Sequence, residues 1–185
     1  MINEDFFASF PKNILQSIDP DSTEGFKLNP PATQDELNHL EQEIGFPIPS
    51  ELALAFRFAN GEPDVSNPEG ILGGDYWLCT SEVVEQYGFH ESQLIDSFGD
   101  DASVWTDTSQ IKQGKIWRKR WLPISWGYDG RVLMIDTDPT AEGTIGQIIL
   151  AEHIDRRFGI IAKSLKELFQ FSLTRKTSLS EWPMV

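Results

Sequence analysis

The histidines and a closely spaced pair of carboxylates are the side chains of this sequence that could do metal or acid–base chemistry. His39, His90 and His153 are the three histidines, and their spacing forms neither H-x-x-x-H nor H-E-x-x-H, so a zinc-hydrolase motif is absent. Asp136 and Asp138 form a D-x-D pair that could bind Mg²⁺. A proline follows Asp138, and Asp is a common turn residue, which favours a turn. We therefore predict no metal site.

Nucleophile and phosphate-binding motifs are also missing. Gly70, Gly73 and Gly74 do not have the spacing of a phosphate-binding loop, and no Lys follows them. No serine lies in a G-x-S-x-G elbow. Cys79 is the single cysteine and lies in an apolar run, which favours a buried, unreactive thiol. We predict no catalytic residue and no cofactor, while an acid–base pair among the 29 carboxylates remains an alternative.

The charge of the chain is strongly asymmetric. Its 185 residues include 15 Lys and Arg against 29 Asp and Glu, a net charge of −14. Residues 1–111 hold 3 basic and 21 acidic residues, a balance of −18, and residues 112–185 hold 12 and 8, a balance of +4. Such a chain is repelled by nucleic-acid phosphates and by anionic membranes. The acidity alone is compatible with a purely solubilising surface, and the alternative is a basic protein partner.

The basic side chains gather in one short stretch. Lys112, Lys115, Arg118, Lys119 and Arg120 alternate with two tryptophans, Trp117 and Trp121, as in some nucleic-acid patches. One cluster in an acidic chain is weak support for that role, because the same side chains can pair with acidic residues of their own chain. Trp105 lies instead among carboxylates, a composition typical either of an anchor in a contact surface or of a residue that covers its own core.

Local patterns predict the elements that must carry these residues. Thr33 and Glu36 form a capping box before an apolar stripe of Leu37, Leu40 and Ile44, and Gly45 has the position of a C-terminal cap. A second helix is expected from an N-cap at Ser50 to an Asn-Gly turn at residues 60–61. Strands are expected at residues 76–79, 121–127, 132–136 and 145–150, and helices after residues 80 and 164. The predicted class is α+β, a single domain in which helices pack a mixed, mostly antiparallel β-sheet.

Residues 33–61 strongly resemble the opening of the SUKH superfamily, which comprises a fungal cell-wall synthesis regulator and many bacterial immunity proteins. The resemblance rests on an ordered series at Leu37, Glu41, Gly45, Ile48, Pro49, Leu52, Phe56, Asn60 and Gly61. The later order W-x-x-I-x-x-x-G-x-x-G, D-x-D-P and G-x-I is similar to the C-terminal half of the family, so the resemblance spans about residues 29–173. Residues 1–28 have no counterpart in it, and the segment 88–120 is longer and more polar than the usual connection of the family at that place.

The resemblance implies an immunity-type protein that binds a toxin domain. We expect this toxin domain to be basic, and a nuclease is one kind of toxin that fits this expectation. A scaffold or regulator like the fungal protein is the alternative, and an enzyme is a weaker one. The candidate contact residues are acidic or aromatic: Glu62, Asp64, Glu69, Asp75, Asp96, Asp100, Asp101, Trp105 and Asp107. The acidic members would steer a basic partner toward the protein.

The expected organisation is an extension at residues 1–28 that packs on the body, the domain at residues 29–176 and a tail at residues 177–185. The N-terminal residues carry Glu4 and Asp5 where a signal peptide needs positive charge. No stretch approaches the roughly 18–20 apolar residues of a membrane span. We therefore expect a cytoplasmic protein that contacts neither nucleic acid nor membrane.

Overall fold

The computed structural model describes Phe6 and residues 28–63, 70–99, 105–106, 108–127 and 130–174. Helix α2 (Gln34–Ile44) begins with the predicted capping box. The Glu36 N–H donates to Thr33 Oγ1 at 3.2 Å, and the Glu36 carboxylate accepts from the Thr33 N–H at 2.7 Å. Gly45 ends the helix with a φ of 78°, a left-handed conformation that glycine adopts without steric cost.

Helix α3 (Ser50–Phe58) begins one position away from the predicted cap. Pro49 occupies the N-cap and Ser50 is the first helical residue, so the prediction of a serine cap is wrong. The Pro49 carbonyl accepts the N–H groups of Leu52 and Ala53 at 2.9 and 3.0 Å. Proline serves at this point because its fixed φ suits the start of a helix.

Helix α4 (Thr80–Phe89) continues through a π-helical turn, η1 (His90–Leu94), into α5 (Ile95–Phe98). Cys79 is the N-cap of α4, and its N–H donates to Glu82 Oε2 at 2.7 Å. Cys79 is half-buried, whereas the sequence predicted a fully buried thiol. Its Sγ lies 3.1 Å from Ser81 Oγ. The beginning of the polar segment 88–120 is therefore helical.

The strands form two antiparallel sheets. The larger has the order β2 (Trp121–Pro123), β4 (Arg131–Asp136), β5 (Gln147–Glu152), β6 (Arg157–Ala162), and the smaller pairs β1 (Tyr76–Trp77) with β3 (Ser125–Trp126). The single strand predicted at residues 121–127 is thus two strands. Ile124 lies between them, where its N–H donates to the Leu133 carbonyl at 2.8 Å and its carbonyl accepts from the Leu78 N–H at 3.1 Å.

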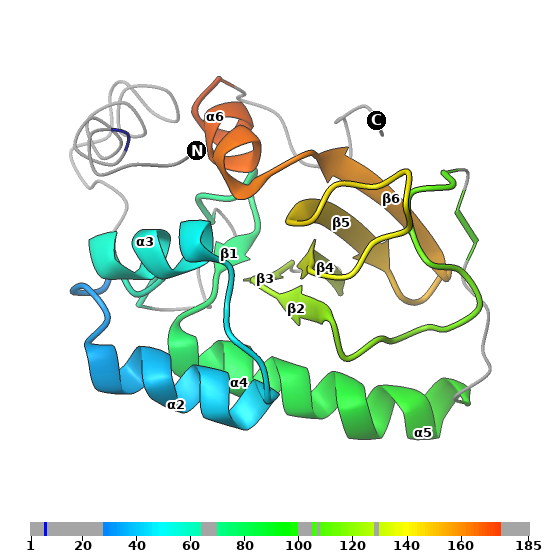
Figure 1. The fold of residues 1–185 in the computed structure, drawn as a ribbon, viewed down its shortest axis with the longest axis horizontal. Helices are drawn as coiled ribbons and strands as arrows, with labels where there is room; N and C mark the ends of the chain where they lie inside the picture. The colour runs from blue at the N-terminus through cyan, green and yellow to red at the C-terminus, as the bar shows by residue number, and fades with distance from the viewer. Residues whose placement is uncertain are drawn as a thin grey trace.

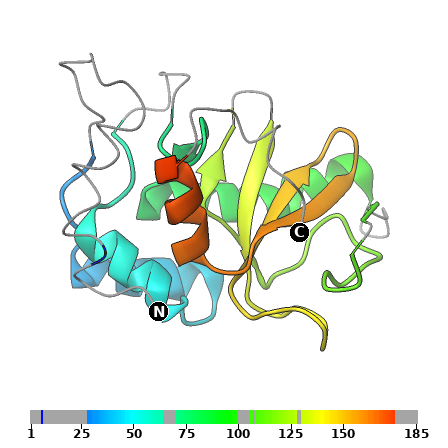
Figure 2. The ribbon, with the colours of Figure 1, turned by 90° about the horizontal axis from the view of Figure 1, so that it is seen from above.

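Helices cover both sides of the sheets (Figure 1). Helices α2, α4 and α5 lie along one side, and α6 (Leu165–Thr174) packs on the other side against β5 and β6 (Figure 2). Ser164 caps α6 as predicted, since its Oγ accepts the Glu167 N–H at 3.2 Å. Trp77 is a core residue, with its ring centroid 6.0 Å from that of Phe56 and 5.3 Å from that of Phe169.

The predicted α+β class is confirmed, and all strand pairings in the two sheets are antiparallel. Phe6 is the one residue before Leu28 that the structure describes, and its ring centroid lies 6.5 Å from that of Phe169 on α6. Among the helices of the described residues, none combines the length and the apolar character that a membrane crossing requires.

Candidate protein-binding surface

Glu62 lies in the interior, which corrects the expectation that it belongs to the acidic surface. It is 5% exposed, and its Oε2 accepts the N–H groups of Ile71 at 3.1 Å and Trp77 at 2.9 Å. Desolvation by burial raises the pKa of this carboxyl to about 7, against the opposing effect of the two backbone hydrogen bonds. Glu62 therefore binds the start of β1 to the loop before it.

Asp75 is also in the interior, with 1% of its surface exposed. Its Oδ1 lies 3.7 Å from Arg131 Nη2, at the start of β4, and an added Cβ on Gly127 would lie 3.0 Å from the same oxygen. This carboxylate is enclosed by the chain around β3 and β4. It cannot meet a partner without rearrangement of that region.

Asp96 and Trp105 are exposed, as a contact role requires. Asp96 lies on α5. Trp105 has 56% of its surface exposed, and the Arg157 guanidinium lies 5.4 Å from its ring centroid. Backbone hydrogen bonds fix its position beside β6, since its N–H donates to the Arg156 carbonyl at 2.6 Å and its carbonyl accepts from the Phe158 N–H at 2.9 Å. The other candidates, Asp64, Glu69, Asp100, Asp101 and Asp107, lie outside the described residues.

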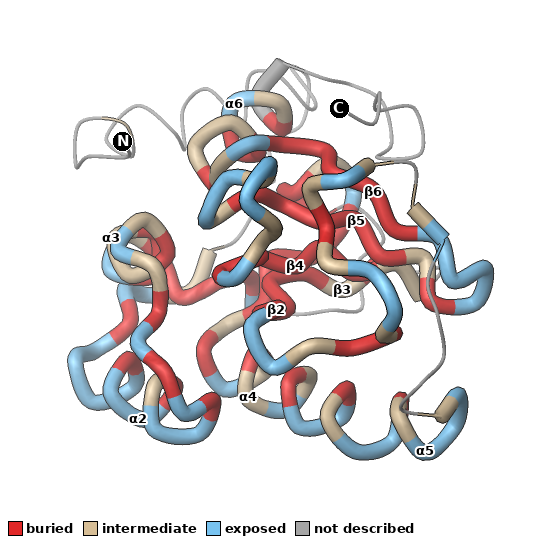
Figure 3. The backbone as a smooth tube through the Cα atoms, turned by 45° about the vertical axis from the view of Figure 1, so that its right-hand side comes forward, coloured by how far each residue is buried: buried red, intermediate tan, exposed pale blue. Residues whose placement is uncertain are grey.

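A larger set of surface carboxylates lies on the helices, and the sequence analysis did not select them. We call α2, α4, η1 and α5 together the acidic helical face, because they contain eight Asp and Glu residues and no Lys or Arg: Asp35, Glu36, Glu41, Glu43, Glu82, Glu85, Glu91 and Asp96. The outer turns of these helices are exposed (Figure 3). The apolar stripe of α2 already indicated this, because it leaves the carboxylates of that helix pointing outward.

Several of these carboxylates are used within the chain. Glu36 and Glu82 cap their own helices, and Glu41 Oε1 accepts the Ile48 N–H at 2.9 Å. Glu91 pairs with Lys119 at 2.6 Å. Glu43 Oε1 lies 3.9 Å from His39 Nδ1. Three exposed carboxylates remain for which no hydrogen bond or ion pair is found within the described part of the chain: Asp35, Glu85 and Asp96.

The basic stretch 112–120 is partly neutralised by its own chain, the alternative raised from the sequence. Lys112 Nζ lies 2.5 Å from Asp138 Oδ2, and Lys119 Nζ lies 2.6 Å from Glu91 Oε1. Arg118 donates to the backbone carbonyls of Lys112 at 3.1 Å and Gln113 at 2.5 Å. The two ion pairs fasten the stretch to the chain after β4 and to η1.

The D-x-D pair forms a turn, as predicted. Asp136 is fully buried, and its Oδ1 accepts the Asp138 N–H at 3.0 Å while Oδ2 accepts from Gln147 Nε2 at 3.0 Å. Burial raises the pKa of the Asp136 carboxyl. Its two oxygens thus serve the β4–β5 connection, and the exposed Asp138 carboxylate faces Lys112.

Two of the histidines are buried side by side. His90 and His153 are 1% and 7% exposed, and their ring centroids are 5.0 Å apart. Desolvation lowers the pKa of both imidazoles, that of His153 to about 3, so both are neutral near pH 7. His39 is exposed, and its Nδ1 lies 3.9 Å from Glu43 Oε1. Within the described ranges no three His, Cys, Asp or Glu side chains are grouped so as to hold a metal ion.

Comparison with known proteins places this geometry in a family. The model of the SMI1/KNR4 family (SUKH-1) matches residues 31–170, which include the acidic helical face, both sheets and Trp105. A comparison with curated proteins found no match.

Proposed function

The chain belongs to the SMI1/KNR4 family (SUKH-1), and from this membership we propose that it is an immunity-type protein that neutralises a cognate toxin domain. Membership itself supports an immunity-type or a regulatory role. In our proposal the toxin domain is basic on its contact side, and the protein acts by covering the active site or the substrate groove.

The acidic helical face is the observation that favours a basic partner. Eight carboxylates without a Lys or Arg produce a negative potential along one side of the molecule. Such a surface accelerates association with a basic partner and disfavours acidic ones, and the effect weakens as salt rises. If the toxin is a nuclease, the same surface occupies the groove that otherwise holds phosphates.

Action by occlusion fits the way the ionisable interior is used. The buried carboxyls of Glu62 and Asp136 bind backbone and side-chain N–H groups of their own chain. The buried His90 imidazole binds the Gln86 carbonyl at 2.6 Å. These groups stabilise the fold, which leaves the exposed face to act by binding.

The contact region in this proposal includes the acidic helical face, with Asp96, and the exposed Trp105. The carboxylates Asp64, Glu69, Asp100, Asp101 and Asp107 stay in the proposal as predictions from the sequence. Glu62 and Asp75 are removed from it because both are buried.

Co-expression tests the proposal. Each protein domain encoded beside this gene is expressed in a test host with and without this protein, and those that inhibit growth are purified with it to measure complex formation. We expect restored growth and a complex of defined stoichiometry. An inactivated toxin domain serves as the control for expression burden. If neither rescue nor a complex is seen with any product of the adjacent genes, the immunity role is rejected in favour of the regulatory one, in which several other partners are bound.

A further inference from the structure

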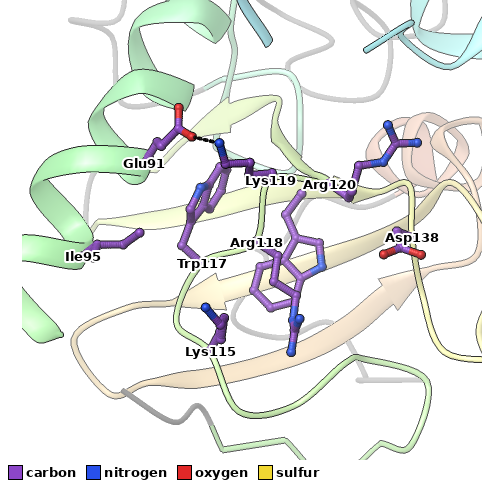
Figure 4. Close-up of a pocket in the computed structure, with 9 residues that line it drawn as sticks. Glu91, Ile95, Lys115, Trp117, Arg118, Lys119, Arg120 and Asp138 are labelled. Carbon is purple, nitrogen blue, oxygen red and sulfur yellow. Dashed lines mark ion pairs between the residues drawn. The ribbon is translucent and has the colours of Figure 1, made fainter. Parts of the chain in front are cut away.

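A pocket of about 560 Å³ lies between the acidic helical face and the basic stretch. Glu91 of η1 and Ile95 of α5 line one side, and Asp138 lies on the opposite side (Figure 4). The remaining lining residues all belong to residues 115–121. Its volume is in the range of pockets that bind small molecules.

The charge of the pocket is opposite to that of the chain. Its lining includes Lys115, Arg118, Lys119 and Arg120 against Glu91 and Asp138, and Asp138 is already paired with Lys112. Lys119 is paired with Glu91. Arg120 is exposed and makes no ion pair with any carboxylate of the described residues, while its guanidinium lies 4.3 Å from the ring centroid of Phe46. A local excess of positive charge favours an anionic occupant.

The tryptophans of the lining add apolar surface beside the cations. Trp117 and Trp121 are 3% and 0% exposed, and in the part of the chain that the structure describes neither indole N–H has a hydrogen-bond partner. Both indole nitrogens are enclosed by the chain, so an occupant of the pocket does not reach them. Lys and Arg can only donate hydrogen bonds. An occupant that supplies acceptor oxygens therefore suits the cations of the lining.

We infer that this pocket receives an acidic side chain, Glu or Asp, of the partner protein, held by Arg120. A carboxylate is favoured over a nucleic acid because the face beside the pocket is acidic. A long polyanion would extend beyond the pocket, where the acidic helical face would repel it over a Debye length of about 8–10 Å. A single carboxylate on a basic partner would not be repelled in this way. A partner that fits both the acidic helical face and this pocket has a basic contact surface with one acidic side chain in it.

This inference rests on the proposed function for the identity of the partner, but the pocket can be tested alone. The probe is a short acetylated, amidated peptide with two central Glu residues, and the matched probe has Gln in their place. Binding is followed by NMR through the indole N–H signals of Trp117 and Trp121, assigned with Trp→Phe variants. We expect the Glu peptide to shift these two signals and the Gln peptide to leave them unchanged.

Variants then locate the binding. Arg120→Gln should weaken peptide binding at least about tenfold, as expected for the loss of a charged hydrogen bond, and Arg120→Lys should restore part of it. Arg57→Gln is the control, because this exposed Arg of α3 binds Gln34 and lies outside the pocket lining. Circular dichroism verifies that each variant is folded. Equal shifts from both peptides, shifts from inorganic phosphate or a short oligonucleotide alone, or unchanged binding by Arg120→Gln would each overturn the inference.

The cognate toxin domain separates this inference from the proposed function. Rescue of growth with an affinity that Arg120→Gln does not change would reject the pocket and keep the immunity role. Peptide binding in the pocket without rescue would reject the immunity role and keep the pocket.

Discussion

Asn60 caps helix α4 from a distance of twenty residues, through two hydrogen bonds to Thr80. Asn60 Oδ1 accepts the Thr80 N–H at 2.8 Å, and Asn60 Nδ2 donates to Thr80 Oγ1 at 3.2 Å. The Asn60 carbonyl in turn accepts from Asn29 Nδ2 at 2.9 Å. The Asn-Gly turn after α3 is therefore a connection between the first helices and the rest of the domain. Its role goes beyond reversing the chain.

Asn60→Ala should lower the free energy of unfolding by about 2 kcal/mol, because it leaves the buried Thr80 N–H without its acceptor. Urea denaturation followed by tryptophan fluorescence measures the change. Asn38→Ala is the matched control, since Asn38 is exposed and accepts one hydrogen bond from Gln34; we expect it to change stability by less than about 0.5 kcal/mol. Equal effects of the two substitutions would show that the cap contributes nothing.

Glu62 predicts a loss of stability as pH rises from about 4.5 to 7. The pKa of the Glu62 carboxyl in the folded protein is raised to about 7 from its ordinary value of 4.5, so in this window the folded protein binds more protons than the unfolded chain. Its stabilising contribution is complete below pH 4.5 and is lost as pH rises through 7. The total is of the order of 3 kcal/mol at most.

Glu62→Gln tests this assignment because its Oε1 can still accept from Ile71 and Trp77. The difference in unfolding free energy between the natural protein and the variant, measured by urea denaturation across this pH range, should shift against the natural protein as pH rises. A difference independent of pH would contradict a raised pKa at Glu62. Glu142→Gln, at an exposed position, is the control for substitution itself.

The acidic helical face predicts a salt-dependent association rate. Neutralising Asp35, Glu85 and Asp96 together, as Asp35→Asn, Glu85→Gln and Asp96→Asn, should slow association with the toxin domain about tenfold at low salt and change dissociation little. Stopped-flow fluorescence at several salt concentrations measures both rates.

The matched control neutralises three carboxylates outside the proposed contact region, Glu51, Glu142 and Glu167, which lie on α3, in the β4–β5 connection and on α6. A similar slowing by both triple variants would mean that total charge steers the partner, without a preferred face. If the association rate of the natural protein does not depend on salt concentration, electrostatic steering is rejected.

Trp105→Ala separates an interface anchor from a cover of the core. Because 56% of the side chain is exposed, the unfolding free energy should fall by less than about 1 kcal/mol. As an anchor, the same substitution should weaken the complex by about 2 kcal/mol or more. Calorimetric titration and urea denaturation give the two values. Ile145→Ala is the control, since Ile145 is an exposed apolar residue of the β4–β5 connection; a loss of stability at Trp105 with unchanged affinity would identify a cover.

Short-range patterns of the sequence predicted most helix ends and turns correctly. The capping box of Thr33 and Glu36, the Gly45 cap and the Ser164 cap each depend on residues within three or four positions, and each is present. The Pro49 cap was missed because a serine next to it is the better side-chain acceptor in general. Here the fixed φ of Pro49 determines where the helix begins.

Contacts between distant segments were beyond local patterns. Glu62 is indistinguishable in sequence from a surface carboxylate, and its burial follows from two N–H groups that lie 9 and 15 residues away. The split of residues 121–127 into two strands likewise depends on β1 and β4, which approach Ile124 from different parts of the chain. The pocket could not be predicted from local patterns either, because its lining combines the basic stretch with residues of η1 and with Asp138, which are distant in sequence.

The position of Ile124 also has a consequence for cooperativity. One peptide group of this residue bonds to β4 and the other to the chain after β1, so hydrogen bonds of the larger and the smaller sheet meet at one residue. Opening either sheet pulls on the hydrogen bonds of the other. The slowest-exchanging amides of the two sheets should therefore report the same opening free energy, and the domain should unfold as one unit.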